Sequence, residues 1–136
     1  MLLDDIMAVL QADDDLMALL PGGLHSAMEI SRQLTPTAFD ENGEIQPCGL
    51  MKTGNEIPVG PYTNSVQTPI TVYLYERAGY DSIEAADQLI FGLLNNKKIG
   101  AATWSVDFDG TLYRQHDTAL DCPMMLSRCH ATRIKQ

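Results

Sequence analysis

The sequence predicts an α+β fold: a mainly antiparallel sheet of about four strands, with two helical elements packed on one of its faces. Two patterns carry this prediction. Apolar residues recur at helical spacing near the N-terminus and after residue 81, whereas β-branched and aromatic residues alternate with polar ones in several segments between and after them. The length of 136 residues fits one domain, residues 1–136, with a core of ordinary size.

The first helical element is expected between residues 2 and 20. Apolar side chains from Leu2 to Leu10 follow the helical period, and three aspartates at 13–15 then interrupt them. An aspartate at this break can cap a second short helix and place negative charge at the positive end of its dipole. The Pro-Gly-Gly sequence at 21–23 ends the element, because proline cannot continue the helical ladder.

The middle of the chain predicts strands separated by a long loop. Residues 24–30 can form a short strand, and the Asn-Gly pair at 42–43 marks a turn. Residues 48–53 predict a second strand, and residues 70–76 (ITVYLYE) predict the most regular one. The intervening residues 54–69 are rich in Gly and Pro and predict a long loop, disordered in the free subunit.

The main helix is expected to begin at Asp81, where Asp81 and Glu84 form a capping box. Its polar side should carry Asp87 together with Glu84, Gln88 and Asn95. Leu89 should be buried between this helix and the sheet, together with Leu74 and Trp104. One apolar stripe should pack on the sheet: Ile83, Ala86, Leu89, Ile90, Leu93 and Leu94.

Two further strands complete the predicted sheet. Residues 103–108 place Trp104, Val106 and Phe108 on one face, and Asp109-Gly110 predicts a tight turn after them. Residues 124–134 also alternate, but both alternating sets mix polar and apolar residues, so the core face of this last strand stays open.

The charge of the chain argues against binding to nucleic acids or membranes. The net charge is −9, and the 9 Lys and Arg residues are scattered, so there is no basic face for sequence-specific nucleic-acid binding. Acidic proteins are repelled by anionic membranes, and no apolar run approaches the roughly 20 residues of a membrane span. The acidic start LLDDIM lacks the basic region of a signal peptide, which predicts a cytosol-like compartment.

No pattern of catalytic, cofactor-binding or metal-ligating residues is present. Cys48, Cys122 and Cys129 are odd in number and widely spaced, which predicts reduced thiols in the core. Cys129 and His130 should point to opposite faces of a strand, which argues against a metal site with Cys122 and His116. A phosphate-binding loop and a Gly-x-Ser-x-Gly elbow are both missing, so we expect a protein that is not an enzyme.

Three segments resemble siphophage tail terminator proteins, also called tail completion or tail-to-head joining proteins. They are LLDDIMAVLQADDDLMALLPGGL, LTPTAFDENGEIQPCGLMK and ITVYLYERAGYDSIEAADQLIFGLL, and the resemblance spans about residues 2–134. It implies a homohexameric ring on the last ring of the tail tube, which stops tube polymerisation and joins the tail to the head. The implied partners are other copies of the chain, the tail tube protein and a head-closure or neck protein, in a virion assembled in the host cytoplasm.

Alternatives to this interpretation remain open at this point. Within structural proteins the rival is another neck component, such as a head-closure or stopper protein. From another class, the rival is a small ligand- or metal-binding domain that uses residues 54–69. The acidic balance favours a ring whose negative lumen lets phage DNA pass without binding.

Candidate assembly residues follow from this interpretation. The loop at 54–69 should contact a neighbouring subunit or the tail tube through Ile57, Val59, Tyr62 and Asn64, because apolar anchors contribute most of the binding energy at interfaces. The acidic side chains proposed to face the lumen are Asp107, Asp109 and Asp117.

Overall fold

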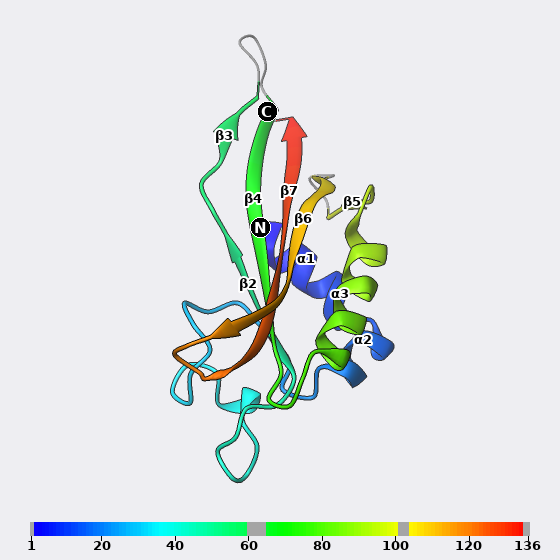
Figure 1. Ribbon diagram of the computed structural model, residues 1–136. Helices are drawn as coiled ribbons and strands as arrows, with labels where there is room; N and C mark the ends of the chain where they lie inside the picture. The colour runs from blue at the N-terminus through cyan, green and yellow to red at the C-terminus, as the bar shows by residue number, and fades with distance from the viewer. Residues whose placement is uncertain (1, 60–64, 101–103, 135–136) are drawn as a thin grey trace.

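A computed structural model describes residues 2–59, 65–100 and 104–134 (Figure 1). Its α+β class agrees with the prediction, but its sheet has seven strands instead of about four. In chain order the elements are α1 (Leu2–Gln11), α2 (Asp14–Leu19), β1 (Leu24–His25), the 3-10 helix η1 (Pro36–Ala38), β2 (Cys48–Thr53), β3 (Ile57–Pro58), β4 (Ser65–Tyr75), α3 (Asp81–Leu94), β5 (Lys98–Ile99), β6 (Trp104–Asp117) and β7 (Cys122–Ile134).

The sheet has the strand order β1-β2-β4-β7-β6-β5, with β3 paired to the outer part of β4. Only β1 and β2 run parallel; the other pairs of described strands are antiparallel, as predicted. β1 and β5 are short, so most of the sheet consists of the long strands β4, β6 and β7. Figure 1 shows these long strands twisting across one another, with the β6–β7 hairpin curving away from the helices.

The tight turn predicted at Asp109-Gly110 is wrong, because β6 continues through these residues to Asp117. Phe108 pairs with Cys129 and Gly110 pairs with Arg128, so Asp109 is the extra residue of a β-bulge. A bulge bends a strand and increases its twist, which accounts for the curvature of the β6–β7 hairpin.

All three α-helices pack on one face of the sheet, where the main core lies (Figure 1). The alternation of β7 that the sequence left open is resolved here, since Met125, Ser127, Cys129 and Ala131 are buried towards the helices. Leu74 and Trp104 are buried as predicted. The burial predicted for Leu89 is wrong, because Leu89 lies at the edge of the α3 stripe and, like Leu93, is only half-buried. The buried residues of the stripe are Ile83, Ala86, Ile90 and Leu94.

The helix caps agree with the prediction at α2 and differ at α3. Asp13 caps α2 by accepting a hydrogen bond from the Leu16 N–H at 2.9 Å. At α3 the N-cap residue is Tyr80, which makes no side-chain cap bond, and Glu76, the residue after β4, accepts a hydrogen bond from Ile83 N–H at 3.4 Å. The predicted capping box at Asp81 does not form, because Glu84 is paired with Arg114 at 3.3 Å instead.

Residues 26–47 pack on the sheet face opposite the helices, where they form a second core together with residues of β2, β4 and β7. Only residues 24 and 25 of the predicted 24–30 strand pair with the sheet, because Ser31 and Thr35 then turn the chain through mutual hydrogen bonds. The predicted turn at 42–43 is present, with Gly43 at a φ of 75°. The buried members of this second core are Ile30, Ala38, Ile45, Cys48, Leu50, Tyr75 and Cys122.

Part of the loop predicted at 54–69 is strand, because β3 and the first residues of β4 pair there as the two arms of a hairpin. β4 begins at Ser65, five residues before the predicted start, and Ile57 and Pro58 pair with Gln67 and Val66. The prolines and glycines of this segment led to the loop prediction, although its second half alternates as a strand does. Every second residue there, Val66, Thr68 and Ile70, is buried.

Candidate functional site

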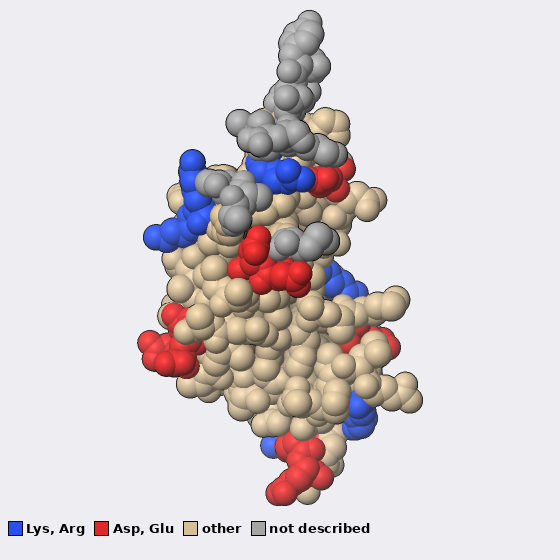
Figure 2. Space-filling view, turned by 180° about the vertical axis from the view of Figure 1, so that it is seen from behind, with Lys and Arg blue, Asp and Glu red and all other residues tan. Residues whose placement is uncertain are grey.

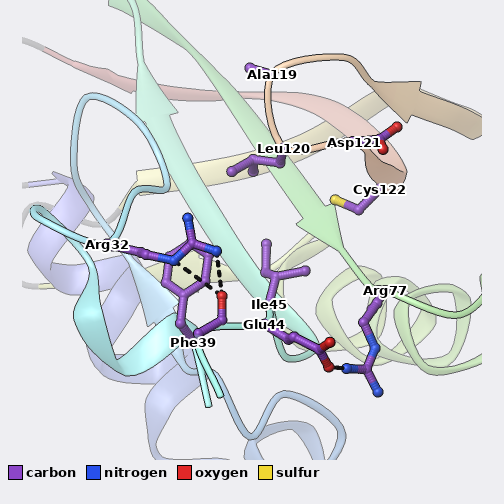
Figure 3. Close-up of a pocket in the computed structure, with 10 residues that line it drawn as sticks. Arg32, Phe39, Glu44, Ile45, Arg77, Ala119, Leu120, Asp121 and Cys122 are labelled. Carbon is purple, nitrogen blue, oxygen red and sulfur yellow. Dashed lines mark hydrogen bonds and ion pairs between the residues drawn. The ribbon is translucent and has the colours of Figure 1, made fainter. Parts of the chain in front are cut away.

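The pocket in Figure 3 lies between residues 32–45 and the turn that leads into β7, and it has a volume of about 280 Å³. Arg32 packs over the Phe39 ring at 4.9 Å and donates a hydrogen bond from Nε to the Gly43 carbonyl at 3.1 Å. Arg77 forms an ion pair with Glu44. The two guanidinium groups of this pocket therefore already have partners within the chain.

The remaining ionisable groups of this pocket lack the geometry of a catalytic site. Asp121 accepts a hydrogen bond from His116 Nε2 at 3.0 Å, and both side chains are exposed. Burial raises the pKa of the Cys122 thiol to about 11, so this sulfur stays protonated and weakly nucleophilic near neutral pH.

All three cysteines are buried, as predicted, and none forms a disulfide. Burial raises the pKa of Cys48 to about 12, and the same cause raises the pKa of Cys129 to about 12. Cys129 lies on the helix side of β7 and His130 on the other side, also as predicted. Within the described ranges, no group of three His, Cys, Asp or Glu side chains could hold a metal ion.

The predicted interface residues fall at the far end of the β3–β4 hairpin. Ile57 is 50% exposed and Val59 is 40% exposed, although both are apolar. This arm is fixed to the sheet, because the Arg133 side chain binds Glu56 at 3.1 Å and Val59 N–H donates to the Ser65 carbonyl at 3.0 Å. Tyr62 and Asn64 lie outside the described residues.

Two of the predicted lumen acids, Asp107 and Asp109, lie together beside His130, and Asp117 lies further along β6. His130 Nδ1 donates to Asp109 Oδ1 at 2.8 Å, and its Nε2 lies 3.9 Å from Asp107. Asp117 instead accepts from Leu120 N–H at 2.9 Å in the turn before β7. The partners of Asp107 and Asp117 on β7 are eight residues apart, or about 26 Å along the strand.

The other acidic residues on the surface that Figure 2 shows do not form one continuous acidic face. Figure 2 shows the helix side of the molecule, where Asp and Glu side chains gather in several separate patches with uncharged surface between them. No helix in the described ranges is long and apolar enough to cross a membrane.

A groove between α3 and β6 joins aromatic and acidic side chains. It has a volume of about 390 Å³, and Phe91 and Phe108 meet in its wall edge to face, with ring centroids 5.2 Å apart. Tyr113, at its end, is 54% exposed. The side chains and backbone that line it are Asp87, Gln88, Phe91, Phe108, Asp109, Gly110, Thr111 and Tyr113.

Asp87 lines this groove from below, in contrast to the predicted position on the polar face of α3. It is only 5% exposed and accepts a hydrogen bond from the Ser127 hydroxyl, which also meets the Thr111 hydroxyl at 2.9 Å. Burial raises the pKa of Asp87, and the bond from Ser127 opposes that change.

A second depression lies near the other edge of the sheet, beside β2. It has a volume of about 460 Å³ and joins residues 26–28 to the end of β2 and to Leu3 of α1. Met28 is 80% exposed there, and Lys52 lies beside it with its ammonium 5.9 Å from the Tyr73 ring. Lys52 is the only charged side chain among those described in its lining.

Sequence patterns did not identify these two surfaces. The exposed aromatic Phe91 lies outside the apolar stripe of α3, which was a usable signal. The signal was absent for Asp87, because its partner Ser127 is 40 residues away in the sequence.

The fold is similar to that of a chain in a solved structure, the virion of a native gene transfer agent particle. The two align with a TM-score of 0.66 over 96% of this chain and 92% of that one, at 14% sequence identity. No protein-family model matches the sequence, and no curated protein matches it. At 14% identity, the structural likeness establishes a shared fold for the two chains.

Proposed function

We propose that this chain is a structural virion protein of a tailed bacteriophage or a phage-like particle, and that it is not an enzyme. The observation that carries the proposal is the likeness to a gene transfer agent virion chain over nearly the whole of both molecules. Because both chains are covered almost completely, the likeness extends beyond one common motif. The finer role that we propose is that of a tail terminator, a homohexameric ring at the head-proximal end of the tail tube.

The surface of the subunit favours assembly over chemistry. Seven large apolar side chains among the described residues are at least 40% exposed, and they lie in separate regions of the surface. They are Met28, Leu34, Ile57, Val59, Phe91, Leu112 and Tyr113. A subunit that contacts several neighbours needs such separate apolar regions, whereas an enzyme gathers its functional residues at one site.

The surfaces near the two edges of the sheet favour a closed ring. The β2 side carries Met28 and Lys52, and the α3–β6 side carries aromatic and acidic residues, so the two sides are unlike each other. Unlike surfaces on opposite sides of a subunit produce head-to-tail contacts, which close into a ring when the rotation between neighbours is suitable.

Deletion of the gene in the cells that produce the particle tests the proposed role. Loss of a terminator removes the stop signal, so we expect tail tubes of uncontrolled length beside heads without tails, as seen by electron microscopy. Expression of the chain from a plasmid should restore tails of normal length. The purified chain, mixed with tail tubes, should appear as a ring at one tube end.

Two other outcomes would contradict the terminator role in different ways. Tails of normal length beside unattached heads that lose their DNA would indicate a head-closure or stopper protein. Complete and infectious particles without the chain would exclude a structural role in the virion.

A further inference from the structure

We propose that neighbouring subunits of this ring join by inserting Met28 and Lys52 of one copy into the aromatic and acidic groove between α3 and β6 of the next. This inference rests on the proposed ring, and it identifies the surfaces that close it. The occupant of the groove is thus a second copy of this chain, through residues 26–28 and the end of β2.

The groove has the chemistry to bind an apolar side chain beside a cation. Phe91, Phe108 and Tyr113 give it aromatic walls, and aromatic rings bind both methionine sulfur and ammonium groups favourably. Asp109 supplies an exposed carboxylate, Asp87 lies nearly buried in the lining, and no Lys or Arg is among the described residues that line the groove. His130 donates to Asp109 and holds that carboxylate near the groove.

The depression beside β2 has the complementary composition. Met28 projects into solvent and is 80% exposed, which a monomer does not require for its own stability. Lys52 is exposed, and no Asp or Glu in the described ranges forms an ion pair with it. Thus one surface has a cation without an anion, and the other has an exposed carboxylate, Asp109, with no Lys or Arg among the described residues that line it.

The position of the two surfaces in the fold suits a head-to-tail contact. β2 lies near one edge of the sheet and β6 near the other, with β4 and β7 between them. Figure 1 shows β2 on one side of the molecule and α3, next to β6, on the opposite side. A contact between opposite sides leaves the joined pair with one free surface of each kind, so the same contact repeats until the ring closes.

Charge reversal tests this contact without disturbing the core, because Lys52 and Asp109 are both exposed. Lys52→Glu and Asp109→Lys should each reduce the amount of ring roughly tenfold, because like charges then face each other. The double variant should recover most of the loss, because it restores an opposite pair. Native mass spectrometry and counts of capped tail tubes measure the amount of ring.

Matched reversals outside both surfaces control for net charge. Lys98→Glu and Glu41→Lys change the charge by the same amounts at exposed positions, and they should leave ring formation unchanged. If both single variants form rings as well as wild type, or the double variant recovers nothing, this contact is wrong while the ring remains. If wild type forms no ring on tail tubes, the proposed function fails first.

Cysteine crosslinking gives a second and independent readout. Met28→Cys combined with Tyr113→Cys should form a ladder of crosslinked oligomers with a short bismaleimide, because the two positions meet across the contact. The three native thiols are buried, with pKa values raised by burial, so they react slowly. Each single variant should give no ladder beyond a dimer. Rings that form without crosslinking in the double variant would overturn the proposed contact.

Discussion

The helix-covered side of the sheet and the two hairpin ends of the same sheet differ in where they place apolar side chains. Under the helices, Ile6, Leu10, Ile83 and Ile90 have no exposed surface. At the hairpin ends, apolar side chains of similar size lie in solvent: Ile57, Val59, Leu112 and Tyr113. The strands are continuous between the two regions, so the difference comes from what covers them.

The residues that stabilise the subunit are therefore separate from the residues that are available for contacts with other subunits or proteins. Apolar burial contributes about 25 cal/mol for each Å² removed from water, and the helix side has already gained that contribution within the single chain. The exposed side chains can gain it only by contact with another molecule. Substitutions should therefore affect either unfolding or assembly, according to the region they lie in.

The largest effect on unfolding should come from the helix side. Ile90→Ala removes a side chain with no exposed surface from the contact between α3 and the sheet. The loss of buried surface and the remaining cavity should lower the free energy of unfolding by about 2–5 kcal/mol. Urea denaturation measures the change. Gln88→Ala, an exposed position on the same helix, should change stability by less than about 0.5 kcal/mol.

An intermediate effect should come from Asp87, which is buried but opens onto the groove. Burial raises its pKa in the folded protein, so folding favours its protonated form. The stability from this group is fully present below the unfolded pKa, near 3.8, and is lost as the pH rises through the folded pKa. The slope of this loss is at most about 1.4 kcal/mol per pH unit.

Asp87→Asn removes this dependence, because the amide does not titrate in that range. The amide oxygen of the new side chain should accept the hydrogen bond from the Ser127 hydroxyl, as the carboxylate does in wild type. The free energy of unfolding of the variant should vary less between pH 4 and neutrality. Urea denaturation at several pH values tests this. A variant with the same pH dependence as wild type would show that Asp87 titrates normally in the fold.

A smaller effect, with the opposite sign, is expected at Thr68. This residue is buried on the helix side of β4, and its hydroxyl has no hydrogen-bond partner in the described part of the chain. Valine has nearly the same shape and no polar atom to desolvate. Thr68→Val should therefore stabilise the subunit by about 1 kcal/mol. Thr71→Val, on the half-exposed face of the same strand, serves as the control. A less stable Thr68→Val variant would indicate a partner for the hydroxyl.

Elements with a local signal could be predicted from the sequence, and elements set by distant partners could not. The three helices follow from apolar spacing and from Asp13, which caps α2 within its own turn. The extension of β6 beyond Asp109 could not be predicted, because β7 supplies the pairing for a segment that locally resembles a turn. The early start of β4 depends in the same way on β7, which pairs with it from Ser65 onward.

The candidate surfaces were predictable to different degrees for the same reason. Ile57 and Val59 were identified because apolar residues among prolines and glycines are unusual, and both are exposed. The acids at 107, 109 and 117 were chosen by charge alone, without any signal for the distance of Asp117 from the other two or for the pairing of Asp109 with His130. The groove was missed because α3 and β6 each supply half of it.

The smallest effect on unfolding should come from the exposed end of the β3–β4 hairpin. Ile57→Ser combined with Val59→Ser replaces two apolar side chains that are exposed in the single subunit. The backbone pairing of Ile57 with Gln67 and the Arg133–Glu56 ion pair do not depend on these side chains. The free energy of unfolding should therefore change by less than about 0.5 kcal/mol.

The same double variant should nevertheless fail in assembly, because this end of the hairpin is the predicted contact with a neighbouring subunit or the tail tube. Apolar anchors at the centre of an interface typically contribute more than about 1 kcal/mol each, and serine cannot replace that contribution. The number of capped tail tubes in a mixture with purified tubes measures the loss. Asn55→Ser, an exposed polar position on the same arm, should cap tubes as wild type does. If the double variant also caps tubes normally, the hairpin end is not an assembly contact, and its apolar residues need another explanation.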